Sequence, residues 1–177
     1  MSETSEFVAQ AREGAREEAD AYRGNAPRPL GGYVLVLAAF SSLVAATAGL
    51  AVATGRRLPP DVRTRDLVLL VAGTHKLSRL LTKDPVTSPL RSPFTRFQET
   101  GGPAEVNEEV RRASQVRHAI GEMVTCPFCV SLWIATGFAI GVVFAPRFTR
   151  LVAATFSVVA GSDFLQLAYS ALQSAET

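Results

Sequence analysis

The chain has 177 residues, about the length of one domain, and a formal net charge of +2 at pH 7. That charge is too small to indicate a nucleic-acid partner, and two cysteines cannot make a disulfide-rich scaffold. Hydrophobic residues make up 47% of the chain, an ordinary fraction, but they are gathered into long uncharged runs.

Residues 1–29 are predicted to form a polar helix on the cytoplasmic side of a membrane. Apolar side chains recur near the helical period from Phe7 to Tyr22 and form a narrow stripe on a charged helix. Prolines and glycines between Asn25 and Gly32 end this helix. Because the first residues are acidic rather than basic, we expect no secretory signal, and the first apolar run should remain as a membrane anchor.

Residues 30–177 are predicted to form a transmembrane domain. Three runs, Pro29 to Gly55, Met123 to Pro146 and Leu151 to Ala175, carry no charge except Asp163, and each reaches the roughly 20 residues that cross a bilayer. A fourth segment, residues 62–81, contains cations near its end. It crosses the membrane only if these cations snorkel or face other helices. Otherwise it is a buried, non-spanning segment. The expected spans are residues 32–54, 62–81, 126–146 and 149–172; a soluble bundle with unusually apolar helices is the alternative.

The loop of residues 82–125 is predicted to be cytoplasmic. Its prolines should prevent any regular element before residue 104, and residues 104–123 predict an amphipathic helix at the membrane surface. The N-terminal segment and the stretch from Lys76 to Arg117 together carry 12 lysines and arginines, whereas the other two loops together carry six. Both termini should therefore be cytoplasmic.

Asp163 falls near the middle of the last apolar run, where an unpaired carboxylate is costly. Counting residues along the two helices places it at the depth of the cations in residues 62–81. We therefore predict an intramembrane ion pair between Asp163 and Arg79, with His75 or Lys76 as substitute partners. A static pair that fixes helix packing is favoured, and a proton- or ion-linked site in a small transport component is the alternative.

Cys126 and Cys129 form a C-x-x-C pattern at the expected start of a helix, where the helix dipole favours a thiolate. The pattern resembles that of glutaredoxins, but nothing nearby predicts the βαβ setting of such a site. Packing thiols are favoured, and redox or metal chemistry is the alternative. Zinc or another metal would need further ligands, which His118 and His75 would complete.

A cationic stretch with interspersed hydroxyl groups, containing Lys83, Arg91 and Arg96, is a candidate for contact with anionic lipid head groups. The general charge bias of a cytoplasmic loop is the favoured explanation. The sequence has no glycine-rich phosphate loop, G-x-S-x-G or H-E-x-x-H pattern. It therefore identifies no enzyme and favours a non-enzymatic role without a required cofactor.

A series of short stretches carries a family resemblance: Thr74-His75-Lys76-Leu77-Ser78-Arg79-Leu80-Leu81, Lys83-Asp84, Pro89-Leu90-Arg91, Pro93-Phe94-Thr95, Glu122, Thr125-Cys126-Pro127-Phe128-Cys129 and Trp133. Over about residues 62–172 the chain resembles the bacterial membrane family catalogued as domain of unknown function 1360, which includes a sporulation-associated membrane protein. The resemblance implies a small multi-helix membrane protein and no established activity.

These observations predict an all-α fold, an integral membrane bundle of about four transmembrane helices with a cytoplasmic amphipathic helix. The protein should be a multi-pass component of the cell membrane. Its expected partners are the lipid bilayer, anionic head groups, and a protein partner or a second copy, with no nucleic acid. A scaffold or accessory subunit is favoured. The alternatives are thiol-redox or metal chemistry at Cys126 and Cys129, and transport through Asp163.

Overall fold

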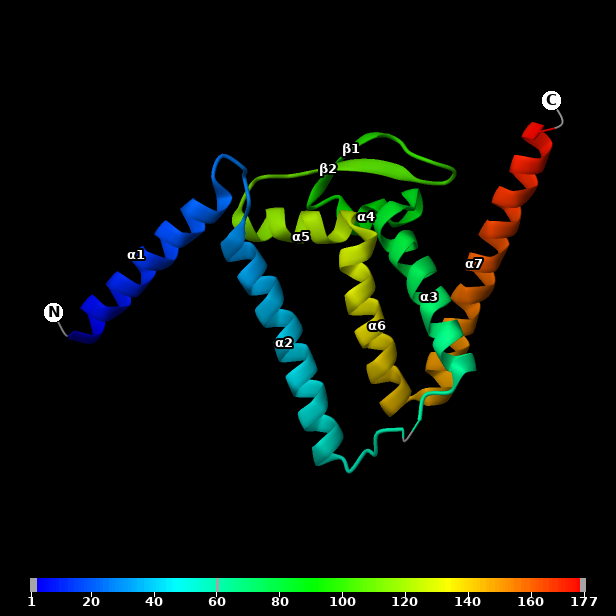
Figure 1. Ribbon diagram of the computed structural model, residues 1–177, viewed down its shortest axis with the longest axis horizontal. Helices are drawn as coiled ribbons and strands as arrows, with labels where there is room; N and C mark the ends of the chain where they lie inside the picture. Colours follow the sequence, from blue (N-terminus) through cyan, green and yellow to red (C-terminus); the bar gives the residue numbers. More distant parts are fainter. Residues whose placement is uncertain (1–2, 60, 176–177) are drawn as a thin grey trace.

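The computed structural model describes residues 3–59 and 61–175. It is mainly helical and includes a small two-stranded sheet (Figure 1). The elements in chain order are α1 (Glu3–Arg23), α2 (Leu30–Ala53), α3 (Thr64–Lys83), the 3-10 turn η1 (Pro85–Thr87), α4 (Ser88–Arg91), β1 (Thr95–Thr100), β2 (Val106–Val110), α5 (Gln115–Thr125), α6 (Pro127–Phe144) and α7 (Pro146–Ala175).

Three helices of the described chain, α2, α6 and α7, are long and apolar enough to cross a membrane. They correspond to three of the four predicted spans. The segment predicted as the remaining span forms α3, which carries more charge and does not reach the same apolarity. The count of four spans therefore stays a prediction.

Helix α3 packs against both α6 and α7, and its contact with α7 is the more extensive (Figure 1). Gly73 permits that contact, because a Cβ atom there would lie 3.1 Å from the carbonyl oxygen of Ala153. Ser157 Oγ of α7 also donates a hydrogen bond to the carbonyl of Leu69 of α3 at 2.8 Å. At the start of the two helices, Arg150 pairs with the buried Asp66 at 2.9 Å.

The region after α3 corrects two predictions. Residues 82–103 were expected to be irregular and residues 104–123 helical; instead η1, α4 and an antiparallel β1–β2 hairpin form, and α5 begins only at Gln115. Pro85 and Pro89 occupy first-turn positions, where the missing N–H costs nothing. The remaining prolines lie outside the strands, so the strands pair from Thr95↔Val110 to Thr100↔Val106, with a bulge between Phe97 and Glu99. The fold is therefore mainly helical rather than all-α.

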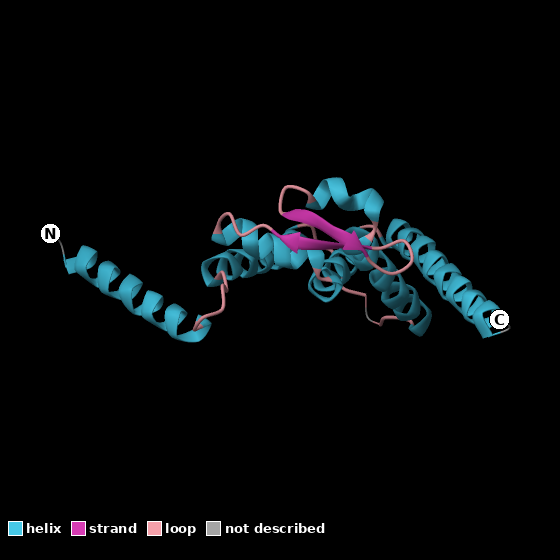
Figure 2. Cartoon of the chain, turned by 90° about the horizontal axis from the view of Figure 1, so that it is seen from above, coloured by secondary structure: helices cyan, strands magenta, loops and turns pink. Residues whose placement is uncertain are grey.

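We call residues 85–125 the cap. Its hairpin lies over the ends of the long helices, and α5 runs across the amino end of α2 (Figures 1 and 2). Gly121 lets α5 approach the hairpin, since a Cβ atom there would be 2.5 Å from Val110 Cγ1. Tyr33 of α2 donates a hydrogen bond to Glu122 of α5, and Arg28 lies 3.6 Å from the same carboxylate.

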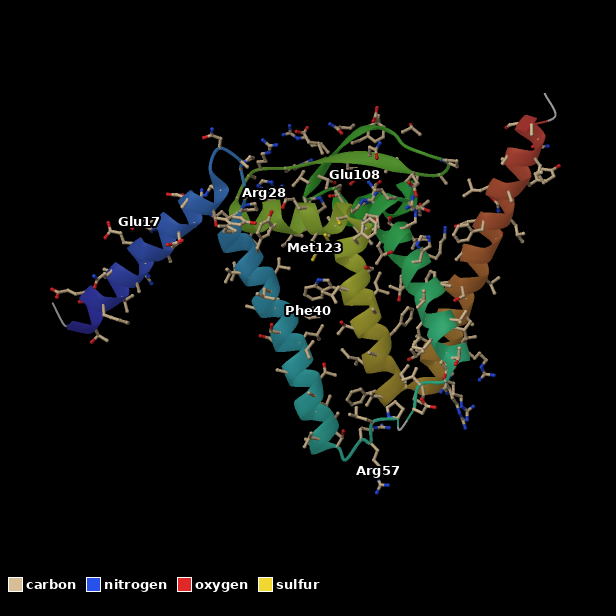
Figure 3. The ribbon with its side chains drawn as sticks, viewed as in Figure 1. Glu17, Arg28, Phe40, Arg57, Glu108 and Met123 are labelled. Atoms are coloured by element: carbon tan, nitrogen blue, oxygen red, sulfur yellow. The ribbon has the colours of Figure 1, made fainter. Side chains whose placement is uncertain are left out.

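Helices α2 and α6 contact each other through aromatic side chains. The ring of Phe40, labelled in Figure 3, meets Trp133 edge to face with centroids 5.2 Å apart. This contact could not be predicted, because the sequence does not indicate which helices are neighbours. The contact joins α2 to the rest of the bundle below the cap.

Candidate functional site

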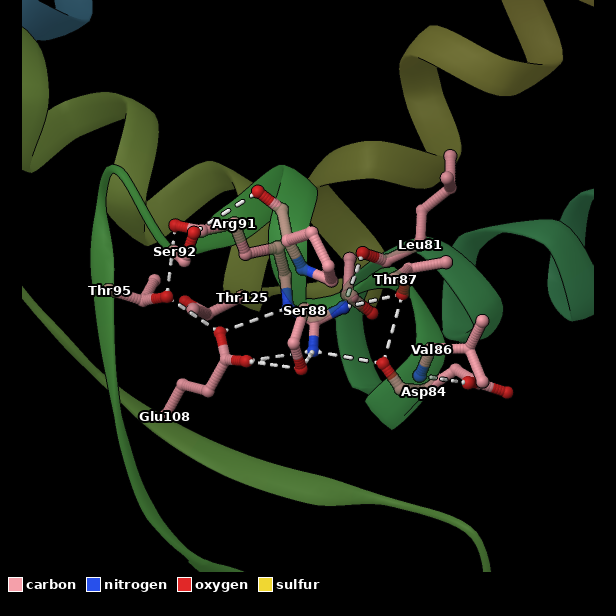
Figure 4. A network of polar contacts seen from close by, with 12 residues as sticks. Leu81, Asp84, Val86, Thr87, Ser88, Arg91, Ser92, Thr95, Glu108 and Thr125 are labelled. Carbon is pink, nitrogen blue, oxygen red and sulfur yellow. Dashed lines mark hydrogen bonds and ion pairs between the residues drawn. The ribbon is translucent and has the colours of Figure 1, made fainter.

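The most completely bonded side chain of the cap is Arg91, which holds three segments together (Figure 4). Its side chain keeps 1% of its surface exposed, and that of its partner Glu108 keeps 5%. Arg91 Nε and Nη2 donate to the two oxygens of Glu108 at 2.9 and 2.8 Å, a bidentate pair. The guanidinium also donates to the carbonyls of Leu81 and Asp84 and to the hydroxyls of Thr87 and Ser88.

Glu108 is held as a carboxylate by these donors. Burial acts to raise its pKa, but hydrogen bonds from Arg91 and Thr95 outweigh burial and keep the pKa of Glu108 below its ordinary value. Thr95 Oγ1 donates to Glu108 Oε2 at 2.7 Å. The network thus joins the end of α3, α4 and both strands.

This network corrects the prediction that Arg91 contacts lipid head groups. Its donors are used inside the protein, so the side chain is not offered to the bilayer surface. Of the other two cations of that prediction, Lys83 is half-buried at the end of α3 and Arg96 is exposed on β1. The sequence could not separate Arg91 from its neighbours, because its partner Glu108 lies 17 residues away on β2.

The carboxylate of Asp163 lies on α7 next to α3. Lys76 Nζ lies 2.5 Å from Asp163 Oδ2, so the partner is Lys76, named from the sequence as a substitute. The first expected partner, Arg79, pairs instead with Glu105, close to the hairpin. Arg79 lies one helical turn nearer to the cap, and Glu105 reaches it there. His75 does not bond to Asp163; its ring stacks on Phe164 with centroids 6.1 Å apart.

The two cysteines lie where α5 passes into α6, and both are free thiols. Cys126 is the N-cap of α6, and the N–H of Cys129 donates to its Sγ at 3.3 Å. His118 is buried on α5, 3.4 Å from Glu122, whereas His75 lies on α3. Within residues 3–59 and 61–175, no three His, Cys, Asp or Glu side chains are grouped to hold a metal ion.

A cavity of about 500 Å³ lies between α3 and α6, which sequence reasoning did not predict. Its polar lining includes Thr74, His75, Ser78 and Arg79, and the rest is mainly apolar, including Phe128 and Phe138. Lys76 and Asp163 do not line it. Finding it requires knowing that α3 and α6 are neighbours.

A second hollow, of about 460 Å³, lies in the cap. Four arginines line it: Arg96 from β1, Arg111 and Arg112 from the connection after β2, and Arg117 from α5. From the sequence, Arg111 and Arg112 fell within the amphipathic helix predicted for residues 104–123. The density of arginines between residues 110 and 118 was the available signal, but its significance depends on the hairpin that brings Arg96 beside them.

The sequence is similar to a protein family of unknown function and to two bacterial proteins. Residues 69–169 match the family described as "Protein of unknown function (DUF1360)". Two proteins of Bacillus subtilis (strain 168) are similar: "Sporulation protein YjcA", 39% identical over 77 residues covering 42% of this chain and 64% of that protein, and "UPF0713 protein YngL", 26% identical over 80 residues covering 45% and 59%. The match therefore spans less than two thirds of either relative. No solved structure matches the chain.

Proposed function

The chain belongs to the DUF1360 family, and from this premise and its geometry we propose that it is a multi-pass membrane protein with a non-enzymatic role as a scaffold or accessory subunit. In this proposal the long helices cross the cell membrane. The cap and both termini lie on the cytoplasmic side. The cap presents a rigid basic surface to lipid or to a protein partner.

One observation carries the proposal: the apolar helices turn their large side chains outward. Only 6% of the most apolar stretch of α2 is buried, and 11% of those of α6 and α7. Leu35 and Leu37 of α2 and Leu165 of α7 are exposed on the protein surface. Such surfaces are stable when the surroundings are hydrocarbon, whereas soluble proteins rarely expose large contiguous apolar patches.

The charges of α3 support its role as a fourth span. Lys76 is paired with Asp163, and Asp66, near the other end of α3, is paired with Arg150. Pairing across α3 and α7 reduces the cost of placing these groups in or near hydrocarbon. With four spans, the carboxyl end of α7 lies on the same side as the cap, in agreement with the arrangement in Figure 1.

The alternative of transport through Asp163 has less support. Its carboxylate is engaged by Lys76, and the cavity between α3 and α6 is lined by neither residue. The paired geometry favours a static contact that fixes the position of α7 against α3.

Cysteine accessibility in intact cells tests the proposed topology. In a background with Cys126→Ser and Cys129→Ser, single cysteines are introduced as Asn25→Cys and Gln98→Cys, or as Arg57→Cys and Arg147→Cys. A membrane-impermeant maleimide should label Arg57→Cys and Arg147→Cys in intact cells, and Asn25→Cys and Gln98→Cys only after lysis. Labelling of both Asn25→Cys and Gln98→Cys in intact cells, with Arg57→Cys and Arg147→Cys protected, would reverse the orientation. Labelling of Arg57→Cys and Gln98→Cys with protection of Arg147→Cys would remove α3 as a span.

A further inference from the structure

The hollow in the cap, which we call the arginine hollow, gathers four guanidinium groups from separate segments. Arg96 lies on β1, Arg111 and Arg112 follow β2, and Arg117 lies in the first turn of α5. Only one acidic side chain, Glu109, is part of its lining. The amino end of α5, capped by Ser114, adds the positive end of a helix dipole to this region.

Three of these arginines have no protein partner for their side chains in the described chain. No ion pair or side-chain hydrogen bond joins Arg96, Arg112 or Arg117 to another described residue, although Arg96 is directly opposite Glu109 in the hairpin. Arg111 is fixed by a hydrogen bond from Nε to the carbonyl of Thr95 at 2.8 Å. The hollow therefore combines one anchored guanidinium with three unengaged ones.

Three arginines elsewhere in the structure are engaged by carboxylates. Arg91, Arg79 and Arg150 each have a carboxylate from a distant part of the chain. Several like charges held together without such partners repel one another, and a bound anion removes that cost. The contrast indicates that the arginine hollow is a site for an external anion rather than a part of the internal ion-pair framework.

We propose that the arginine hollow binds a phosphate monoester group. A guanidinium offers paired N–H donors that match phosphate oxygens, and a dianionic phosphate accepts several such forks at once. A singly charged carboxylate compensates fewer of the four cations. In the proposed topology the cap lies between the membrane surface and water, so the phosphate belongs either to a lipid head group or to a soluble phosphate compound. This site goes beyond the scaffold role and does not depend on it.

Calorimetric titration of the full chain in uncharged detergent at low ionic strength tests the site. The probes are inorganic phosphate, dihexanoyl phosphatidic acid, and dihexanoyl phosphatidylcholine as a lipid without a monoester. We expect phosphate or phosphatidic acid to bind and phosphatidylcholine not to bind. Added sodium chloride should weaken the binding, because the exposed charges are screened.

The variant Arg112→Gln/Arg117→Gln should weaken binding by about tenfold or more for each arginine removed, the scale of a charge-assisted hydrogen bond. Arg57→Gln is the matched control. It removes an exposed arginine at the opposite end of the molecule from Glu108 of the cap (Figure 3). A second variant, Arg112→Lys/Arg117→Lys, keeps the charge and loses the planar fork. It should bind more weakly than the unaltered chain but more tightly than the glutamine variant. If the glutamine variant fails to fold, the weaker binding of the lysine variant tests the proposal.

The outcomes separate the sources of the phosphate. Tighter binding of phosphatidic acid than of inorganic phosphate assigns the site to a lipid head group, and the reverse order assigns it to a soluble compound. The proposal is overturned if neither probe binds, or if the arginine variants bind as tightly as the unaltered chain. It is also overturned if Arg57→Gln loses as much affinity. Because the measurement uses detergent-solubilised protein, it is independent of the topology experiment.

Discussion

Arg91 and Glu108 form a buried pair whose members depend on each other. The variant Arg91→Met leaves the Glu108 carboxylate buried without its cation, and it should cost about 3–5 kcal/mol of stability. Thermal unfolding in detergent, followed by circular dichroism and by proteolysis of the cap, measures the loss. The control is Arg79→Met, which breaks the more exposed pair with Glu105 and should cost about 0–1 kcal/mol. Equal effects of the two variants would contradict the central role of Arg91.

Glu108 also predicts a pH dependence. Its pKa is lower in the folded protein than its ordinary value, because the bonds from Arg91 and Thr95 outweigh burial. The stability it contributes is therefore complete above the unfolded pKa and is lost as pH falls through the folded pKa. The unfolding temperature should decline below roughly pH 5, and less steeply for Glu108→Gln. An identical decline in both proteins would show that other carboxylates control acid unfolding.

At the level of the helices, the contact between α3 and α7 depends on a small residue. Gly73→Leu would place a side chain where Ala153 already lies and should cost about 1–3 kcal/mol of stability. The matched control is Gly49→Leu in α2, where an added Cβ would meet nothing within 4 Å. Unfolding temperatures in detergent compare them. Similar values for both variants would indicate that α3 and α7 are not closely packed.

The ion pair between α3 and α7 predicts a coupled effect. Lys76→Met and Asp163→Leu should each destabilise the protein, because each leaves one charge without its partner. The double variant should be more stable than the sum of the two losses indicates, with a coupling on the order of 1 kcal/mol. A double-mutant cycle from unfolding temperatures measures it. Strict additivity would show that the 2.5 Å contact does not stabilise the pair of helices.

For the whole molecule, the outward-facing apolar side chains of α2, α6 and α7 are those expected of helices in a membrane. After expression, the protein should stay in the membrane pellet at alkaline pH and high salt, and it should dissolve only with detergent. Immunoblotting of the supernatant and pellet measures this, with a peripheral membrane protein as control. Recovery of a monodisperse chain without detergent would contradict the membrane assignment.

The three apolar helices, the polar N-terminal helix and the family could be predicted from the sequence alone. Uncharged runs long enough to cross a bilayer identified α2, α6 and α7, because helix length and hydrocarbon thickness are fixed by local geometry. The matched series of short stretches identified the family. A polar helix near the N-terminus follows from its periodicity, since such a pattern depends on adjacent residues only.

Tertiary structure alone decided which charged groups meet. Arg91 pairs with Glu108 through the β1–β2 hairpin, and Asp163 selects Lys76 rather than Arg79 because of how α3 lies against α7. The hairpin itself was missed because prolines were weighed only as helix breakers, while strand pairing depends on residues far apart in the chain. The same pairing brings Arg96 beside Arg111, Arg112 and Arg117. Periodicity and length are local properties, whereas charge partners are set by distance in space, and no spacing along a single chain determines that distance.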